Sequence, residues 1–315
     1  MNTDLPIEVR GTTKRYGDFT LDGVDLAVEA GQIVGFIGQN GAGKSTTIKA
    51  LLGLVGLDSG EARILGVPSA ELARTSASKV KERVGVVFDT IAMPSHLTVA
   101  EVAQLMSCAY STWDEQAFSA MISRFKLDRA KTVKDLSRGM GMKLSLACAL
   151  AHNPQVLILD EATAGLDPMA RDEVLDLLRE FVAVEGPNGE PVNAILMSSH
   201  ITSDLEKIAD EIVCIDAGKI MFTCAKDEIT DMMGVARCRM ADMESLLQGG
   251  ALGQEGEVRM LRHDYGIDLL VHDRFEFMRE HPEIPCDRMS IDEYMTFMLK
   301  GEAAMGFGLP KGGER

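Results

Sequence analysis

The fold of this chain is decided by the stretch Gly38-Gln39-Asn40-Gly41-Ala42-Gly43-Lys44-Ser45-Thr46. An apolar segment, residues 32–37, precedes it, and a helix-prone segment, residues 47–52, follows it. A strand, a glycine-rich loop and a helix in this order are typical of a phosphate-binding loop, because the glycines let successive backbone N–H groups point at phosphate oxygens. The helix N-terminus adds partial positive charge. A plain glycine-rich turn is the alternative, and the Lys-Ser pair disfavours it.

The side chains in and before this loop predict its ligand. Lys44 is expected to reach β- and γ-phosphates, and Ser45 to offer its hydroxyl to Mg²⁺. Tyr16 precedes the loop by about one supersecondary unit, and its ring could stack on adenine. A tyrosine at the end of a strand is more often part of the core, so the adenine-stacking role of Tyr16 is supported only by the arrangement of its neighbours.

Bulk composition limits the class of protein. The chain has 315 residues and a formal net charge of −16, which argues against nonspecific binding to nucleic acid or to an anionic membrane surface. No apolar run is long enough to cross a bilayer, and residues 1–10 lack the pattern of a signal peptide, so we expect any membrane role to need a separate partner chain. The six cysteines are scattered without a Cys-x-x-Cys pair, and we expect them to be reduced and mostly buried.

Strand patterns flank the loop on both sides. Residues 7–15 and 19–28 alternate apolar and polar side chains, as half-buried antiparallel strands do. Residues 60–66 and 81–88 are further strand candidates, the second of which ends at Asp89. Residues 99–152 have helical periodicity instead, which predicts a helical subdomain, at about residues 90–152, inserted into an α/β core.

A second anion site is predicted inside the helical insertion. Leu136-Ser137-Arg138-Gly139-Met140 precedes an apolar helix predicted at residues 143–151. Ser137 and Gly139 could simply cap that helix. They could also bind a phosphate at its N-terminus, and the residues alone do not say whose phosphate.

Carboxylates and a histidine follow two further apolar runs. Residues 156–159 read straight into Asp160 and Glu161, as a parallel strand with its carboxyl end at a ligand site would. Asp160 would hold Mg²⁺ through water, and Glu161 would act as a general base or orient water. His200 follows the strand predicted at residues 192–198, and the pattern Ser203-x-x-Glu206 predicts a cap for the next helix.

The chain changes character after Cys224. Residues 225–235 look helical, residues 236–272 mix short strands with a helix near residues 242–248, and residues 290–300 form an amphipathic helix. The glycine-rich tail, residues 306–315, is expected to be loose. We hypothesise an accessory α+β segment at residues 226–315 that contacts its mate in a dimer.

Taken together, these motifs resemble those of the nucleotide-binding subunit of an ABC transporter, over about residues 5–225. The motifs follow the family's order: the adenine-stacking Tyr16, the Walker A loop with Gly38, Asn40, Gly41, Gly43, Lys44, Ser45 and Thr46, the signature motif with Ser137 and Gly139, Walker B with Asp160 and Glu161, the D-loop (residues 165–167) with Asp167, and the switch histidine His200. The resemblance implies an α/β P-loop NTPase core with an antiparallel β subdomain and an inserted α-helical subdomain at residues 1–225, followed by a small C-terminal α+β extension at residues 226–315.

Two positions depart from the family pattern. The glutamine that normally follows the strand before the helical insertion is replaced by Asp89, which could still contact Mg²⁺ but adds local negative charge. The signature motif has Arg138 and Met140 where Gly and Gln are usual, so we expect phosphate sensing to persist with altered interdomain hydrogen bonding. Both changes are similar to those of bacterial exporter ATPases that pair with a separate permease.

The resemblance also implies a mechanism and partners. Two such domains would face each other head to tail, with ATP and Mg²⁺ between the Walker A loop of one and the signature motif of the other, and Asp167 addressing the opposite subunit. Lys44, Glu161 and His200 would then carry hydrolysis. The partners would be a second nucleotide-binding subunit, in a homodimer or heterodimer, and a transmembrane permease contacted by Asp89 and residues 90–130. The chain would be cytoplasmic, attached to the inner membrane through the permease.

Two other classes compete with this reading. A soluble ABC ATPase acting on ribosomes or DNA is disfavoured, because ribosomal types usually carry two such domains, residues 90–136 are too short for the long coiled coil of DNA-repair types, and the acidic charge disfavours nucleic acid. A non-hydrolysing, ATP-gated interaction protein is disfavoured by Glu161 and His200. The cargo and the direction of transport are not encoded in these motifs.

Overall fold

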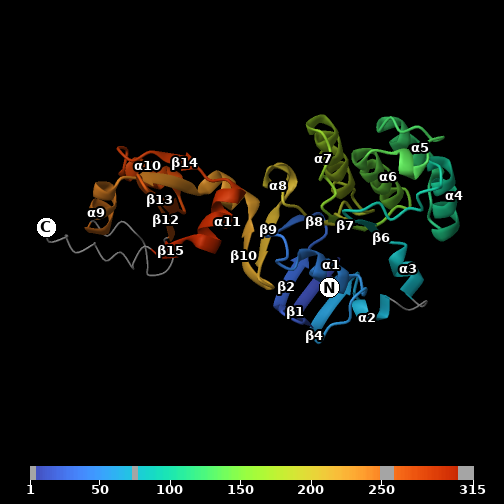
Figure 1. The fold of residues 1–315 in the computed structure, drawn as a ribbon, viewed down its shortest axis with the longest axis horizontal. Coiled ribbons are helices and arrows are strands. Elements are labelled where there is room, and N and C mark those ends of the chain that lie inside the picture. Colours follow the sequence, from blue (N-terminus) through green and yellow to red (C-terminus); the bar gives the residue numbers. More distant parts are fainter. Residues whose placement is uncertain (1–4, 73–76, 249–258, 304–315) are drawn as a thin grey trace. The chain divides into compact units, whose positions relative to one another are not determined.

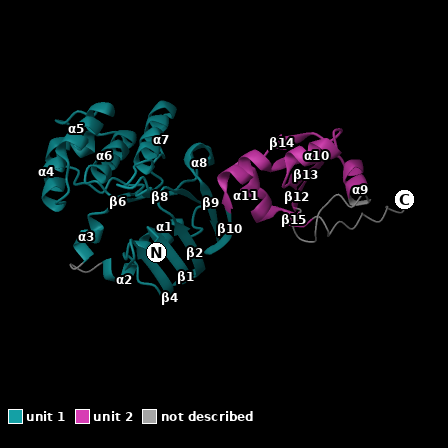
Figure 2. Cartoon of the chain, turned by 180° about the vertical axis from the view of Figure 1, so that it is seen from behind, with its two compact units in different colours: residues 1–223 teal, residues 224–315 magenta. Residues whose placement is uncertain are grey.

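The computed structural model describes residues 5–72, 77–248 and 259–303. The chain divides into two compact units, residues 1–223 and residues 224–315, and each is described by itself (Figure 2).

Unit 1 is organised around a six-stranded sheet with the strand order β10-β9-β3-β8-β7-β6 (Figure 1). Its strands are β3 (Ile33–Ile37), β6 (Val84–Val87), β7 (Val156–Asp160), β8 (Ala194–Ser198), β9 (Glu211–Asp216) and β10 (Lys219–Ala225). The first five of these pair in parallel, so their carboxyl ends meet at one edge of the sheet. Strands β3, β7 and β8 are buried at every position, because helices or a second sheet cover both faces.

A smaller antiparallel sheet packs against one face of the parallel sheet. Its order is β2-β1-β4-β5, with β1 (Ile7–Tyr16), β2 (Phe19–Val28), β4 (Ser59–Ile64) and β5 (Val67–Pro68). The predicted antiparallel pairing of the first two strands is confirmed by the register of β1 with β2. Inward side chains of this sheet share one apolar core with helix α1 (Lys44–Leu51) and with alternate residues of the parallel strands, among them Ile7, Phe36 and Ile158.

Helices form the rest of unit 1. They are α2 (Ser69–Leu72), α3 (Ser78–Lys81), α4 (Val99–Ala109), α5 (Glu115–Arg124), the 3₁₀ turn η2 (Val133–Asp135), α6 (Arg138–Leu150), α7 (Pro168–Val182) and α8 (Thr202–Ile208). The predicted helical insertion is confirmed as α4, α5 and α6, which gather together in Figure 1.

Unit 2 is a five-stranded antiparallel sheet with the order β14-β11-β13-β12-β15. Its strands are β11 (Gly234–Cys238), β12 (Arg259–His263), β13 (Gly266–Val271), β14 (Cys286–Arg288) and β15 (Glu302–Ala303), and its helices are η3 (Glu228–Met232), α9 (Met240–Gln248), α10 (Arg274–Glu280) and α11 (Ile291–Lys300). Side chains of α9, such as Met243 and Leu246, pack on one face of the sheet. The amphipathic helix predicted at residues 290–300 is confirmed, and Ser290 with Glu293 forms its capping box.

Several local predictions were wrong. Strand β6 begins at Val84 rather than residue 81, because residues 78–81 form helix α3. The helix expected at residues 225–235 ends at Met232, and Gly234 already pairs in β11. Helix α10 was missed. The predicted tail, residues 306–315, lies outside the described residues.

The predicted cap of α8 is also wrong. Helix α8 follows Ile201 and has no side-chain cap bond, and Ser203 lies inside the helix. The hydroxyl of Ser199 instead accepts from the backbone N–H of Ile201 at 2.9 Å, which turns the chain before the helix begins. The expectation that the cysteines are mostly buried holds for three of the six, Cys148, Cys214 and Cys238, and none of the six forms a disulfide in the described part of the chain.

Candidate nucleotide site

The phosphate loop joins β3 to α1 in a conformation that requires glycine. Gly38, Gly41 and Gly43 have φ values of 156°, 82° and 124°. A Cβ at Gly38 would lie 2.2 Å from the backbone oxygen of Ile215, so no side chain fits there. At Gly38, the backbone of the loop therefore lies directly against strand β9.

The N-terminus of α1 presents free donors. The first intrahelical bond runs from the N–H of Thr47 to the Gly43 oxygen at 2.9 Å, so the N–H groups of Lys44, Ser45 and Thr46 have no partner within the helix. Gly43 occupies the cap position and provides no side-chain bond. Such a terminus binds anions, because its N–H groups and the helix dipole both favour negative charge.

Lys44 places a cation inside this loop. Its side chain is 7% exposed, and its Nζ donates to the backbone oxygens of Gly38 at 2.6 Å and Gln39 at 3.2 Å. Ser45 is exposed at the same helix terminus, and Asn40 is exposed at the tip of the loop. Buried Cys214 pairs in register with Ile37 beside the loop, and burial raises the pKa of its thiol to about 12, so the thiol stays neutral. The charge facing a ligand here is therefore that of Lys44.

The carboxylate Asp160 lies at the carboxyl end of β7, two strands from the phosphate loop. Asp160 is 4% exposed and pairs in register with Ser198 on β8, whose hydroxyl donates to its Oδ1. Ser198 in turn pairs with Phe36 on β3. The three strands β3, β8 and β7 thus end side by side, and Asp160 shares the sheet edge with the phosphate loop.

Glu161 and His200 form a hydrogen-bonded pair at this edge. The Nδ1 of His200 contacts Glu161 Oε2, and the His200 backbone N–H donates to the same oxygen at 3.4 Å. Glu161 has φ 57°, a left-handed conformation that is unfavourable for glutamate and is enriched at functional sites. Its side chain is 17% exposed, whereas that of His200 is 54% exposed. The glutamate is therefore fixed by its neighbours, and the imidazole faces solvent.

Two predicted residues lie farther from this cluster. Tyr16 ends β1, is 42% exposed and lies beneath Lys14, whose Nζ is 5.6 Å from its ring centroid. Its cross-strand partner Phe19 approaches the phosphate loop: a Cβ at Gly43 would lie 3.2 Å from the Phe19 ring. Asp89 is exposed after β6, which β8 and β7 separate from β3, so about 14 Å of sheet lies between the strands that carry Asp89 and the phosphate loop.

The remaining predicted residues gather at a different place. Ser137, Gly139 and Asp167 line one pocket between the start of α6 and the start of α7, here called the signature pocket. Ser137 caps α6 by accepting from the Met140 N–H at 3.2 Å, and Asp167 caps α7 by accepting from the Ala170 N–H at 3.0 Å. No residue of the phosphate loop lines this pocket. The sequence thus predicted two groups of residues, and the structure keeps them apart within one chain.

The sequence analysis did not identify three residues that form contacts in or next to the site. Ser198 binds Asp160, and an ion pair between partly exposed Arg171 and buried Asp204 connects α7 with α8. Ser198 ends a predicted strand directly across from Asp160, so strand register was the signal that could have identified it. The Arg171–Asp204 pair gives no such signal, because charged helix residues usually face solvent.

Comparisons with known proteins agree with this geometry. A family model described as ABC transporter matches residues 21–164. Nod factor export ATP-binding protein I of Burkholderia orbicola is 36% identical over 221 residues, which cover 68% of this chain and 69% of that protein. The daunorubicin/doxorubicin resistance ATP-binding protein DrrA of Streptomyces peucetius is 32% identical over 256 residues, 78% of this chain and 74% of its own.

This chain belongs to the ATP-binding subunits of ABC transporters. A solved ATP-binding subunit of an ABC transporter matches this ABC subunit with a TM-score of 0.63 at 28% identity, covering 72% of this chain and 92% of its own. A dimeric ATP-binding cassette bound to ADP and Pi shares the fold, with a TM-score of 0.61 at 20% identity, over 70% of this chain and 98% of its own. The ABC subunit accordingly binds and hydrolyses ATP as the motor of a transporter, and the predicted P-loop fold and ATPase class are confirmed.

Proposed function

We propose that this ABC subunit powers an exporter, with the cluster of Lys44, Asp160, Glu161 and His200 as its hydrolytic centre. The observation that carries the proposal is the shared sheet edge, where a buried cation, free N–H donors and a glutamate–histidine pair meet. The printed names of the relatives, Nod factor export and daunorubicin resistance, support export as the direction of transport.

Each residue of the cluster has a distinct role in this proposal. Lys44 gives up the Gly38 and Gln39 oxygens and binds phosphate oxygens of ATP, while the N–H groups of residues 44–46 hold the same phosphates. Glu161 orients the attacking water and accepts its proton. His200, exposed and hydrogen-bonded to Glu161, holds that carboxylate and contacts the terminal phosphate. The ring of Tyr16 stacks on adenine.

Mg²⁺ fits the oxygen donors of this edge. Within the described ranges, His, Cys, Asp and Glu side chains form no group of three or more that could hold a metal by themselves. Mg²⁺ is usually held by one or two carboxylates together with substrate phosphates and water, so Ser45 and Asp160 with ATP would suffice, and Asp89 would join through water. When bound, Mg²⁺ neutralises charge that develops on the phosphates.

The signature pocket points to a second copy of the chain or a homologous subunit. Ser137, Gly139 and Asp167 line a pocket that lacks phosphate-loop residues, so they would complete the site of another subunit. In a head-to-tail pair, ATP would lie between the phosphate loop of one copy and the signature pocket of the other. Hydrolysis would remove the contacts to the terminal phosphate and open the pair, which is the two-state change that a motor needs.

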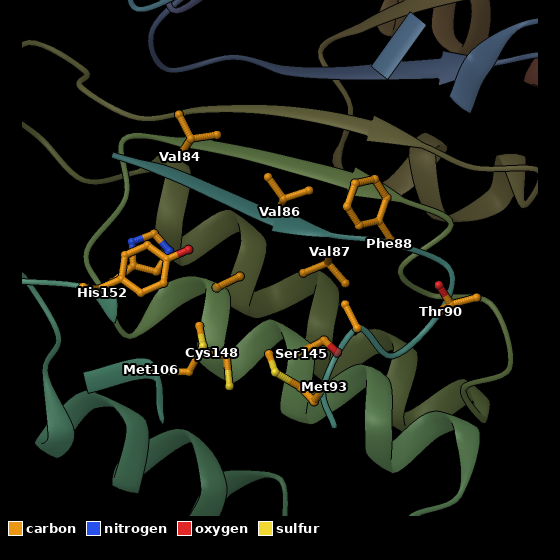
Figure 3. Close-up of a pocket in the computed structure, with 13 residues that line it drawn as sticks. Val84, Val86, Val87, Phe88, Thr90, Met93, Met106, Ser145, Cys148 and His152 are labelled. Atoms are coloured by element: carbon orange, nitrogen blue, oxygen red, sulfur yellow. The ribbon is translucent and has the colours of Figure 1, made fainter. Parts of the chain in front are cut away.

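The permease would dock beside β6. A pocket of Val84, Val87, Phe88, Met106 and Cys148, among others, lies between β6 and the helices α4 and α6 (Figure 3). A second, more apolar pocket shares Val84, Val86 and Phe88 and extends to Leu54, which is 63% exposed. This apolar surface adjoins Asp89 and residues 90–130, the region expected to face the permease.

Attachment through a permease would place the chain at the cytoplasmic face of the inner membrane. None of the helices in the described ranges is both long and apolar enough to cross a bilayer. Co-expression with the permease should bring the chain to membranes, and Leu54→Glu should weaken that association. Tyr265→Glu is the matched control, because Tyr265 is 98% exposed but lies in unit 2. Equal loss in both variants would contradict the docking surface.

The hydrolytic assignment is tested by Glu161→Gln. Loss of the carboxylate should lower ATP turnover by at least about 100-fold, because general bases contribute about 10²–10⁴ to the rate. ATP binding should persist, since Lys44 is untouched, and an ATP-bound dimer should accumulate in size-exclusion chromatography. Glu180→Gln, an exposed partner of Arg124, serves as the control. A Glu161→Gln enzyme that turns over ATP at the wild-type rate would refute the assignment.

A further inference from the structure

An ion pair between the partly exposed Arg171, whose side chain is 24% exposed, and a buried aspartate joins α7 to α8. The side chain of Asp204 is 1% exposed, and its Oδ2 lies 3.6 Å from the Nε of Arg171. Neither atom has a hydrogen-bond partner among the described residues. Burying a carboxylate is costly unless it is paired and hydrogen-bonded, so this pair is held just short of the contact that would satisfy it.

The two members of the pair each lie close in sequence to a predicted site residue. Arg171 lies one helical turn after Asp167, the cap of α7, and its N–H donates to the Asp167 oxygen at 2.9 Å. Asp204 lies four residues after His200, which is bonded to Glu161. The chain from Glu161 to Asp167, helix α7, the ion pair, helix α8 and the His200–Glu161 bond therefore form a closed ring of connections.

A third buried polar atom without a partner lies in the same ring. Thr163, between Glu161 and Asp167, is 1% exposed, and its hydroxyl has no hydrogen-bond partner in the described part of the chain. Unpaired buried groups are uncommon in folded proteins, and each calls for an explanation. Three such atoms in one ring are explained if the ring has a second arrangement, in which these atoms form hydrogen bonds.

We propose that Arg171 and Asp204 are positioning residues for hydrolysis. Approach of Nε and Oδ2 by about 0.7 Å would form a charge-assisted hydrogen bond and fix the D-loop end of α7 relative to the His200 end of α8. This approach sets the geometry of Glu161 and His200 when the second subunit engages Asp167. The inference rests on the proposed function of this site, and neither residue touches ATP.

The same two helices provide a matched control. Lys207 on α8 and Asp172 on α7 form an ion pair at 2.6 Å whose side chains are 48% and 57% exposed. Exposed pairs contribute little, because water screens them and ordering the side chains costs entropy. Asp172→Asn therefore breaks an α7–α8 contact without removing either member of the Arg171–Asp204 pair.

The experiment compares full-length wild type, Asp204→Asn and Asp172→Asn for ATP affinity, turnover and thermal unfolding. Asp204→Asn should lower kcat by about 10-fold, because small misplacements of catalytic groups are costly, while the Kd for ATP changes by less than about 2-fold. Asp172→Asn should keep both within about 2-fold. A folded Asp204→Asn enzyme with wild-type kcat would overturn the inference.

Asp204→Asn leaves Arg171 without its counterion and should lower the melting temperature for that reason. The double variant Arg171→Met, Asp204→Leu removes both charges and keeps apolar packing, so it should recover the melting temperature. Positioning predicts that its kcat stays about 10-fold low, whereas a purely structural role predicts full recovery. A wild-type chain that hydrolyses no ATP would refute the proposed function instead, which separates the two failures.

Discussion

Two helix N-termini of unit 1 are predicted to bind phosphate, and they are built differently. Helix α1 begins at Gly43 without a side-chain cap, so its first N–H groups are free, and buried Lys44 adds a cation. Helix α6 begins at Ser137, whose hydroxyl already accepts from Met140, and Arg138 packs beside Gly165. The first terminus can hold an anion alone. At the second, the Met140 N–H is already bonded to Ser137, so we expect this terminus to bind phosphate only when another subunit presents it.

The largest expected effect is the loss of ATP affinity when the cation at the start of α1 is removed. Lys44→Ala should weaken ATP binding by about 100-fold, since a charge-assisted contact to phosphate is lost, which corresponds to about 2.7 kcal/mol. Isothermal titration measures this directly. Lys49→Ala, on the exposed side of the same helix, should bind as wild type. If both variants bound ATP normally, the phosphate would not lie at α1.

Gly139→Asp tests the second terminus. A carboxylate in the first turn of α6 favours the helix but repels phosphate, and a Cβ there meets only the end of the Leu166 side chain at 3.2 Å and backbone atoms at 3.4 Å or more. Turnover should fall by about 10-fold or more, while ATP affinity stays within about 2-fold. A loss of affinity like that of Lys44→Ala would mean that both termini serve one site in one chain.

Mixing the two variants sharpens the result. In an equal mixture of Lys44→Ala and Gly139→Asp, half of the dimers are mixed, and each mixed dimer retains one complete composite site. Activity should therefore recover to about one quarter of wild type if the sites act independently. Absence of any recovery would contradict a head-to-tail pair of identical chains.

A smaller effect, on stability, is expected from removing the side-chain cap of a helix. Ser137→Ala removes the cap of α6 and should lower the free energy of unfolding by about 1 kcal/mol. Urea denaturation measures the change. Ser203→Ala should be nearly neutral, because α8 has no side-chain cap. Equal destabilisation by the two substitutions would show that the hydrogen bond from Met140 to Ser137 does not stabilise α6.

The smallest effect concerns the other end of α6. Burial lowers the pKa of His152 below its usual 6.5, and its ring stacks on Tyr110 with centroids 4.1 Å apart. A lowered pKa favours neutral histidine in the folded state, so the unfolded chain binds the proton first and stability falls as pH drops below 6.5. Between pH 7.5 and 5.5, the melting temperature should fall about 1–3 °C less in His152→Phe than in wild type. An identical pH dependence would contradict the burial argument.

The sequence predicted what local chemistry dictates. Lys44 and Ser45 follow a glycine-rich loop, and Asp160 ends an apolar strand, so their place at the sheet edge follows from the pattern. The cap at Ser203 failed because Ser199 turns the chain first, and this choice depends on the tertiary path after β8. The sequence does not identify Asp204, because its burial depends on how α7 and α8 pack. Packing between elements that are far apart in the chain could therefore not be predicted from this single sequence.

Glu161 illustrates a conflict between two selective demands. Its backbone adopts φ 57°, where glycine or asparagine would be relaxed and glutamate is strained. Selection for folding alone would replace it, and the replacement would have neither the carboxylate nor its bond to His200. Replacing Glu161 by glycine is therefore expected to relax the backbone and, at the same time, to end ATP turnover.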